Sequence, residues 1–376
     1  MQVVKILHCA DHHIGAAESF LGTLSGRRRF ETLMTFERII DLASEEQVGL
    51  IAIAGDLFDS NTVEDELVKP VLEKIASVPN IKVVFAAGNH DPLTAESPFR
   101  RFSLPENLFV LETQDCCLTF EDLKLKVYGR SFDNTYMKGE ESFSLIPKQD
   151  GYIHVMVQHG ELCHDLHSDY NAITPKFVRG CGMDYLALGH IHKRTPVVTL
   201  GNTNFAYCGC PEGQGFDEEG EKGVYIGTVG KEVCDLRFVP VSKRRHLTAE
   251  VDVTGCSSSG EISEAVLACL RQGGADFAEH LYKIKLIGEL PEEVIPDLNE
   301  ITARVAEAVY FVKLKDETIP LVDTDRLSEE VSLKGLFVKT MMEQMQQAAP
   351  EEKPLFSAAL KLGLAAFGTE VAYHDD

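Results

Sequence analysis

Short clusters of aspartate and histidine recur along the first half of the chain, each directly after an apolar run. The clusters are Asp11-x-His13, Gly55-Asp56-x-x-Asp59, Gly88-Asn89-His90-Asp91, Gln158-His159 and Gly189-His190-x-His192. Carboxylate, amide and imidazole groups are common ligands of divalent cations. A glycine before such a cluster lets the backbone turn sharply enough to aim the side chains. The pattern therefore indicates a metal site at the ends of several strands.

Seven of these side chains offer a nitrogen or oxygen donor: Asp11, His13, Asp56, Asn89, His159, His190 and His192. Seven donors exceed what one tetrahedral ion uses, so two cations that share Asp56 are the economical arrangement. Only the two aspartates are anionic, and two divalent ions would therefore leave a positive site that attracts an anion. Two such ions about 3.5–4 Å apart can generate a hydroxide nucleophile and hold both oxygens of a phosphoryl displacement.

The elements that must position these residues alternate between strand and helix. Apolar runs of strand length cover 3–7, 50–54, 81–87, 153–157 and 185–188, and helical spacing covers 27–43 and 63–77. This order predicts a parallel sheet with right-handed crossovers, whose carboxyl edge gathers the clusters. In extended backbone Asp11 and His13 would project to the same side, because they are two residues apart.

Beyond Pro240 the chain reads as a smaller α+β unit followed by helices. Strands are expected near 247–253, 282–287 and 310–314, helices near 262–270 and 297–308, and two helical pieces between 332 and 367. Two runs of basic residues could either lie on the solvated surface or contact an anion, and for the first run we favour the solvated surface. These runs are Arg27-Arg28-Arg29 and Lys243-Arg244-Arg245.

The length and amino-acid composition of the chain limit the kinds of protein that it can be. With 376 residues and 44% hydrophobic content, the chain is long enough for two or more domains. No apolar run reaches membrane-span length and the N-terminus carries no signal-peptide pattern, so we expect a cytoplasmic protein with no membrane association. The ten cysteines are scattered and read as reduced thiols. A net charge of −23 argues against an extended nucleic-acid-binding surface, so any contact with nucleic acid must be local.

The five clusters, in this order, resemble the calcineurin-like metallophosphoesterase superfamily. Within it, the block 186–192 and the segment 207–223 are similar to the bacterial SbcD- and YhaO-type DNA repair exonucleases. The resemblance covers roughly residues 1–240. It implies a four-layer α/β/β/α sandwich with a small α+β cap domain and a C-terminal helical segment. We accordingly expect a catalytic domain over 1–242, a cap over 243–330 and the helical segment over 331–376.

The resemblance also implies roles for individual residues. One metal would lie on Asp11, His13, Asp56 and His192, and the other on Asp56, Asn89, His159 and His190. His90 would contact the scissile phosphate and assist the leaving oxygen, with Asp91 orienting His90. Asp59 stands where archaeal and eukaryotic relatives commonly carry histidine. The expected cofactors are two divalent ions, with Mn²⁺ ahead of Mg²⁺, Fe²⁺ and Zn²⁺.

The implied function is that of a DNA exonuclease and endonuclease subunit in DNA repair. Its expected partners are DNA, an SMC-like ATPase subunit of the SbcC type and, as a further association, a second copy of the chain. The Met-rich stripe of the C-terminal helices would dock the ATPase or, alternatively, pack on the cap. Two other functions stay open: a metallophosphoesterase of nucleotides, cyclic nucleotides or phosphoproteins, which the charge of −23 supports, and a non-catalytic scaffold for the ATPase.

Overall fold

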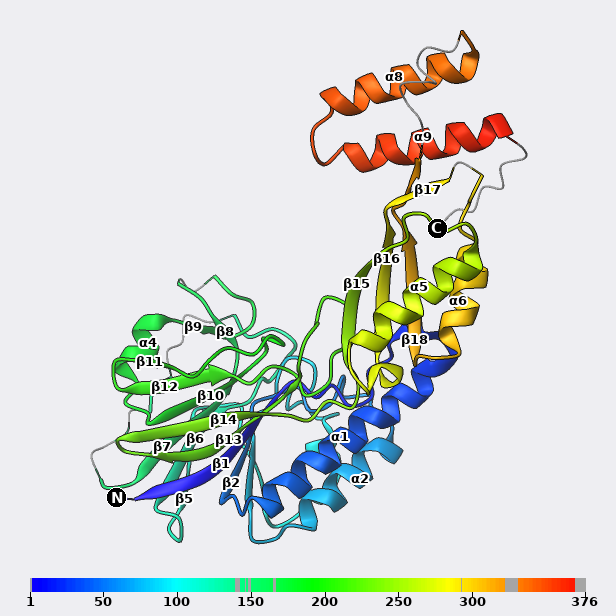
Figure 1. Cartoon of the computed structure of the whole chain (residues 1–376). Coiled ribbons are helices and arrows are strands. Elements are labelled where there is room, and N and C mark those ends of the chain that lie inside the picture. The colour runs from blue at the N-terminus through cyan, green and yellow to red at the C-terminus, as the bar shows by residue number, and fades with distance from the viewer. Residues whose placement is uncertain are drawn as a thin grey trace. The chain divides into compact units, whose positions relative to one another are not determined.

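The computed structural model in Figure 1 divides into two compact units, Met1–Arg245 and His246–Asp376. The structure describes residues 2–138, 143–145, 147, 150–164, 167–291, 293–321 and 331–368. Residues 322–330 and 369–376 of the expected cap and helical segment lie outside these ranges. The boundaries expected after 242 and 330 stay predictions. Among the described residues, no helix combines the length and the apolar character that a membrane crossing requires.

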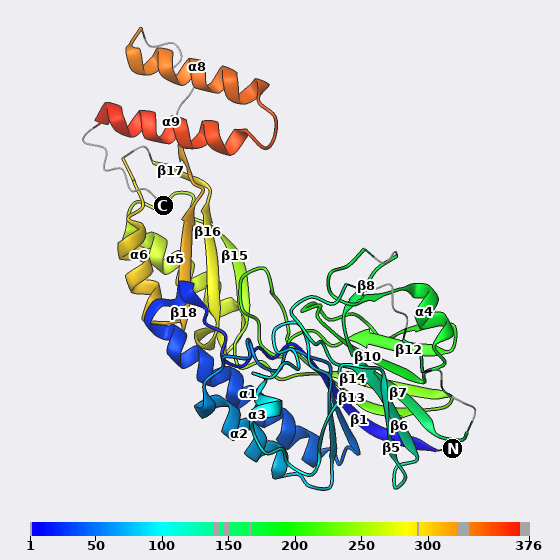
Figure 2. The same cartoon turned by 180° about the vertical axis from the view of Figure 1, so that it is seen from behind.

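The first sheet of unit 1 carries the predicted parallel strands. Its order is β14-β13-β1-β2-β3-β4, in which β1 to β4 are parallel and β13 and β14 are antiparallel additions. The strands are β1 (Val3–Cys9), β2 (Leu50–Ile53), β3 (Lys82–Phe85), β4 (Leu108–Val110), β13 (Gly223–Gly230) and β14 (Val233–Pro240). Helices α1 (Ser25–Glu45) and α2 (Asp65–Ala76) run side by side along this sheet in both views (Figures 1 and 2).

Strand β2 is apolar throughout because both of its faces are buried. Ile51 and Ile53 pack in the cluster that α1 and α2 share with the sheet, whereas Leu50 and Ala52 pack in the cluster between the two sheets. A strand covered on both sides reads as a continuous apolar run instead of an alternating one. This explains why the run 50–54 carried so clear a strand signal.

The second sheet has the order β11-β12-β10-β7-β6-β5, and its inner strands β12, β10, β7 and β6 are parallel. The strands are β5 (Cys116–Phe120), β6 (Leu125–Arg130), β7 (Ile153–His159), β10 (Tyr185–Gly189), β11 (Val198–Leu200) and β12 (Thr203–Tyr207). Helix α4 (Pro175–Gly180) packs on its outer face through Val178. Helices, two sheets and a further helix thus form the predicted four-layer α/β/β/α sandwich. The shorter elements are η1 (Ser19–Leu24), α3 (Pro98–Arg101), β8 (Glu161–Leu162) and β9 (Ala172–Ile173).

Unit 2 contains a three-stranded parallel sheet, in the order β15-β16-β18, with the α+β composition expected for the cap. Its core joins the strands to two helices, with Ile262, Ile284 and Ile301 fully buried. The elements are β15 (His246–Asp252), α5 (Ser259–Gln272), η2 (Phe277–Glu279), β16 (Leu281–Ile287), β17 (Glu289–Pro291), α6 (Leu298–Ala306), β18 (Phe311–Asp316) and β19 (Ile319–Leu321).

The two C-terminal helices form a hairpin, α8 (Leu333–Gln347) against α9 (Lys353–Gly368). Met341, Met342 and Met345 pack within this hairpin on a small core of Val338, Leu360 and Leu364. In addition, Lys361 of α9 forms an ion pair with Asp316 of β18. The methionine stripe is therefore partly covered by its own hairpin, and α9 contacts the cap sheet.

A buried ionic cluster holds several segments of unit 1 together. The Arg28 guanidinium contacts Glu18 at 2.9 Å and Glu212 at 3.0 Å, and Arg244 binds both oxygens of Glu31 at 2.6 and 2.8 Å. Both arginines are 1% exposed. The favoured interpretation of the first basic run as a solvated surface is thus wrong for Arg28, and both interpretations of the second are wrong for Arg244. Buried arginines need such paired carboxylates, which sequence spacing does not reveal.

Candidate metal centre

The carboxyl ends of the parallel strands of both sheets of unit 1 deliver the predicted clusters. In the first sheet, Asp11 follows β1, Asp56 follows β2, and Asn89 follows β3. In the second sheet, His159 ends β7 and His190 follows β10, whose Gly189 pairs with His159 in the sheet register. Strand ends of parallel sheets gather at one edge, so residues far apart in the chain meet there.

Four of the predicted ligand residues have left-handed backbone. Their φ angles are 55° at Asp11, 46° at His13, 50° at Asp56 and 101° at His190. Such values are uncommon for residues other than glycine, cost about 1–3 kcal/mol each, and concentrate at functional sites. The expectation that Asp11 and His13 meet through extended backbone is therefore wrong, although the two side chains do lie together.

Two glycines make room for the neighbouring ligands. A Cβ atom on Gly88 would lie 2.2 Å from Oδ1 of Asp56, and one on Gly55 would lie 2.2 Å from Nδ1 of His159. Gly55 also has a φ of 92°, which a residue with a side chain rarely adopts. The glycines that precede Asp56 and Asn89 in the sequence are thus required by close packing at the site.

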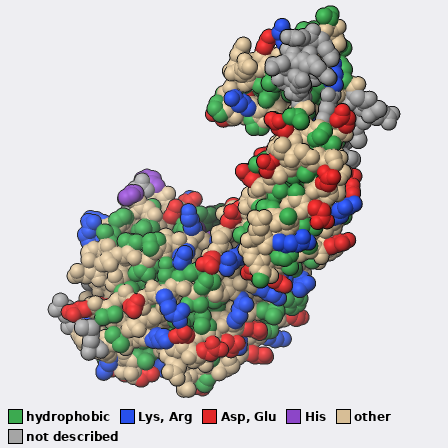
Figure 3. All heavy atoms as spheres, in the orientation of Figure 1, with side chains coloured by type: hydrophobic (Ala, Val, Ile, Leu, Met, Phe, Trp, Pro, Cys, Tyr) green, Lys and Arg blue, Asp and Glu red, His purple; other side chains and the backbone are tan. Residues whose placement is uncertain are grey.

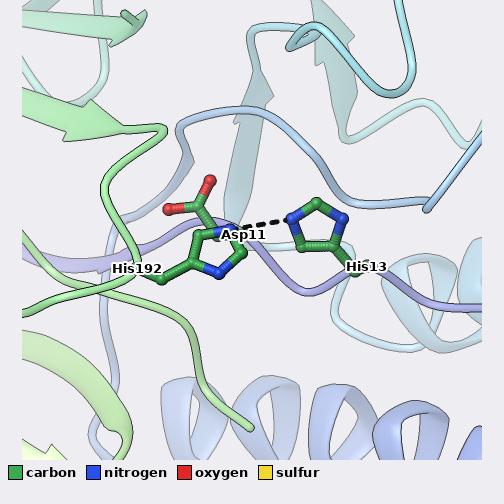
Figure 4. A group of neighbouring side chains, drawn as sticks. All are labelled: Asp11, His13 and His192. Atoms are coloured by element: carbon green, nitrogen blue, oxygen red, sulfur yellow. Dashed lines mark hydrogen bonds between the residues drawn. The ribbon is translucent and has the colours of Figure 1, made fainter. Parts of the chain in front are cut away.

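Figure 4 shows the first group of donors, Asp11, His13 and His192. The Nε2 atoms of His13 and His192 lie 3.0 Å apart, and the Nε2 atom of His13 lies 3.7 Å from Oδ2 of Asp56. The Asp11 carboxylate also accepts the backbone N–H of His190, which holds it in place.

The second group of donors surrounds the side-chain oxygen of Asn89. That oxygen lies 3.0 Å from Nε2 of His159 and 3.2 Å from Nδ1 of His190. The Nε2 atom of His159 in turn lies 3.3 Å from Oδ2 of Asp56. Imidazole nitrogens and amide or carboxylate oxygens that face one another in this way match the preferences of divalent cations.

Asp56 lies between the two groups. Its Oδ1 accepts the backbone N–H of His90 at 2.9 Å, whereas its Oδ2 faces His13 on one side and His159 on the other. The structure thus brings all seven predicted donors together, and this donor set fits divalent cations.

Charges within the buried site shift its titration. Burial opposes ionisation of Asp56, but His159 together with His13 and His90 outweighs that effect and lowers the pKa of Asp56. Burial likewise opposes the charge on His159, but Asp56 and Asp11 raise the pKa of His159 to about 9. Burial lowers the pKa of His190 to about 4. The Asp56 carboxylate therefore stays ionised at neutral pH.

His90 and Asp91 follow Asn89 but face different surroundings. The His90 side chain is 45% exposed, and its Nδ1 lies 3.1 Å from the backbone oxygen of Asp59. The buried Asp91 carboxylate instead accepts the backbone N–H groups of Asp56, Leu57, Phe58 and Gly88. Asp91 thus orients the loop that carries Asp56, whereas the sequence interpretation had it orient His90.

Two acidic side chains that the sequence pattern does not place at the site contact its histidines. The Glu218 carboxylate accepts a hydrogen bond from Nδ1 of His192, and Oδ1 of Asp59 lies 3.2 Å from Nδ1 of His13. The sequence comparison marks Asp59 only as a departure from the histidine of archaeal and eukaryotic relatives. For Glu218 the sequence offers only an acidic run in the loop before β13, one of many acidic runs in this chain.

Comparison with known proteins agrees with this geometry. The chain is 27% identical over 341 residues to the uncharacterized metallophosphoesterase YhaO of Bacillus subtilis, an alignment that covers 84% of this chain and 82% of YhaO. It is 23% identical over 360 residues to the DNA double-strand break repair protein Mre11 of Methanopyrus kandleri (89% and 75% covered). It is 25% identical over 359 residues to Mre11 of Saccharolobus solfataricus (85% and 84% covered).

The sequence profile of the calcineurin-like phosphoesterases matches residues 4–194, just over half of the chain. This segment includes all seven donors and the residues His90 and Asp91. The resemblance inferred from the five clusters is thereby confirmed. The chain belongs to the calcineurin-like phosphoesterase family and is a metal-dependent phosphodiesterase.

Proposed function

We propose that this protein is a two-metal phosphodiesterase that cleaves DNA as the exonuclease and endonuclease subunit of a repair complex. The observation that carries the two-metal part is the place of Asp56, whose Oδ2 faces His13 at 3.7 Å and His159 at 3.3 Å. One carboxylate oxygen between two donor groups is the arrangement that a shared ligand requires.

The chain's own residues prepare the site for a phosphodiester. Asp11, His13, Asp56 and His192 would hold one ion, and Asp56, Asn89, His159 and His190 the other. When bound, the two ions would lower the pKa of an attacking water and stabilise charge on the phosphate, with Mn²⁺ as our first choice. His90, which is exposed beside His13 with ring centroids 4.6 Å apart, would donate a proton or hydrogen bond to the leaving oxygen.

DNA as the substrate is supported by the two relatives named DNA double-strand break repair proteins. The charge of −23 favours a smaller substrate, because phosphate contacts need Lys and Arg. On the face in Figure 3, basic side chains are interspersed with acidic ones and form no continuous basic band. A local DNA contact at the metal centre, with further affinity supplied by a partner, reconciles the charge with this substrate.

The deciding experiment incubates the purified protein with end-labelled linear and hairpin DNA, with added Mn²⁺ and, separately, with chelator. We expect Mn²⁺-dependent cleavage that the chelator stops. A small chromogenic phosphodiester serves as a second substrate. Turnover of that compound without DNA cleavage or competition by DNA would establish the alternative substrate class, and binding of an ATPase without any turnover would establish the scaffold.

The C-terminal hairpin is the proposed docking element for an SMC-like ATPase of the SbcC type. Its methionines are largely covered, but other large apolar side chains are more exposed: Leu336 is 62% exposed, Leu355 71% and Leu362 45%. Exposed leucines of this kind support binding of an apolar helical partner surface. The cytoplasmic location and a homodimer remain predictions from the sequence.

Docking is tested by co-purification of the ATPase encoded in the same organism with Leu336→Glu and Leu362→Glu variants of the full chain. We expect both variants to lose the ATPase while keeping the thermal transition of the wild type. Gln344→Glu, which adds one negative charge at an exposed position of α8, is the matched control. Retention of the ATPase by both leucine variants would contradict docking through the hairpin, and light scattering of the protein alone tests the homodimer.

A further inference from the structure

The imidazole of His192 is held from behind by a carboxylate outside the predicted ligand set. Glu218, in the loop between β12 and β13, accepts a hydrogen bond from Nδ1 of His192 through its Oε1. Its other oxygen, Oε2, accepts the backbone N–H of Gln214 at 2.9 Å and lies 3.4 Å from the Cys210 thiol, which donates to it. Both oxygens of Glu218 are thus engaged, and its side chain is only 16% exposed.

This contact decides which ring nitrogen of His192 can bind a cation. A neutral imidazole carries one N–H, and an acceptor at Nδ1 keeps the proton there, which leaves the lone pair on Nε2. The Nε2 atom of His192 is the one that lies 3.0 Å from Nε2 of His13 in the donor group with Asp11. Glu218 therefore favours the tautomer that this donor group needs.

The same loop also fixes the backbone of His192. The carbonyl oxygen of His192 accepts the backbone N–H of Cys210 at 3.3 Å and the ammonium group of Lys222 at 3.3 Å. The segment between 210 and 222 thus holds both the main chain and the ring of His192. His159 has a comparable contact from its Nδ1 to the backbone oxygen of Ala54 at 2.8 Å, which a side-chain substitution cannot remove.

We propose that Glu218 is a positioning residue, which fixes the tautomer and ring orientation of His192 and so sets the metal affinity of the group Asp11, His13 and His192. The inference rests on the proposed two-metal function. Carboxylate partners of ligand histidines are typically worth about 10–100-fold in metal affinity. Glu218 would act on one of the two metal positions, because its contact is with His192 and not with His159 or His190.

The test is calorimetric titration of the metal-free full chain with Mn²⁺, comparing wild type, Glu218→Ala, Glu218→Gln and Asp217→Asn. We expect two binding events for wild type, and about 10–100-fold weaker binding at one of them in Glu218→Ala. Glu218→Gln retains an acceptor and should lose less. Asp217→Asn removes one exposed negative charge from the same loop and should match wild type.

A second readout is the ¹⁵N spectrum of histidine-labelled, metal-free protein. At a pH where the His192 ring is neutral, it should show His192 protonated on Nδ1 in wild type and as a mixture of tautomers in Glu218→Ala. Unchanged Mn²⁺ affinity and an unchanged tautomer in Glu218→Ala would overturn the role proposed for Glu218 but not the proposed two-metal function. A Glu218→Ala protein that loses both binding events and its thermal transition, with Glu218→Gln doing the same, would show a structural role and also overturn it. A wild-type protein that binds no Mn²⁺ would overturn the proposed function itself.

Discussion

The carboxylate of Asp91 accepts the backbone N–H of Leu57 at 2.8 Å, which joins the loop after β3 to the loop after β2. Each oxygen of this buried carboxylate receives two N–H donors, with Gly88 and Asp56 on Oδ1 and Leu57 and Phe58 on Oδ2. The Asp91 side chain therefore joins the two loops that carry Asp56 and Asn89, in addition to the hydrogen bond from the backbone N–H of His90 to Asp56.

Asp91→Asn should consequently destabilise unit 1 although it preserves the shape of the side chain. The side-chain NH₂ group of asparagine would replace one oxygen and face two N–H donors, and we expect a loss of about 1–3 kcal/mol in the free energy of unfolding. Urea unfolding of the metal-free protein measures it. A variant as stable as wild type would show that the four N–H contacts contribute little.

His90→Ala should reduce phosphodiester cleavage about 10²–10⁴-fold while leaving metal content nearly intact. The reason is that His90 is exposed beside the donors and is absent from both proposed ligand groups. Cleavage of labelled DNA and elemental analysis of the same preparation provide the two measurements. Full activity, or loss of metal, would refute the assignment.

Asp56→Asn should weaken Mn²⁺ binding at both positions, whereas Asp11→Asn should weaken chiefly one. Oδ2 of Asp56 faces both donor groups, whereas Asp11 belongs to the group with His13 and His192. Calorimetric titration separates the two binding events. Equal losses confined to a single position in both variants would contradict a shared ligand.

Buried His8 should make the protein less stable in mild acid. Its imidazole contacts the Tyr185 hydroxyl at 2.9 Å and the backbone oxygen of Leu188 at 3.1 Å, and burial lowers the pKa of His8 to about 3. The unfolded chain takes up this proton near pH 6.5 and the folded chain does not. The contribution of His8 to stability is therefore complete above pH 6.5 and falls by about 1.4 kcal/mol per pH unit below it.

This pH dependence is measured by urea unfolding of metal-free protein between pH 7.5 and about 5. His8→Asn, whatever its stability at neutral pH, should lose less on acidification than wild type does. His164→Gln removes an exposed imidazole and should follow the wild-type curve. Identical slopes for wild type and His8→Asn would exclude His8 as the source.

The sequence predicted those parts of the site whose pattern lies within a few consecutive residues. An apolar run, then a glycine, comes directly before Asp56 and before Asn89. Strand and ligand could therefore be predicted together from a few neighbouring residues. The left-handed backbone at Asp11 and His190 could not, because tertiary contacts impose it against local preference. Glu218 could not be predicted either, since nothing near it in the sequence indicates that its loop returns to His192.

The pair Glu31 and Arg244 has a practical consequence for anyone who wishes to produce the catalytic unit by itself. A fragment ended after residue 242, at the boundary expected from the sequence, would lack the Arg244 guanidinium that binds both oxygens of Glu31. The buried Glu31 carboxylate would keep only its longer contacts with Arg27 and Arg28, both at 3.5 Å. Leaving a buried charge without any partner costs about 3–5 kcal/mol, and the remaining contacts of Glu31 with Arg27 and Arg28 offset part of that cost. A fragment that ends after Arg245 retains the pair and should therefore be more stable than one that ends three residues earlier.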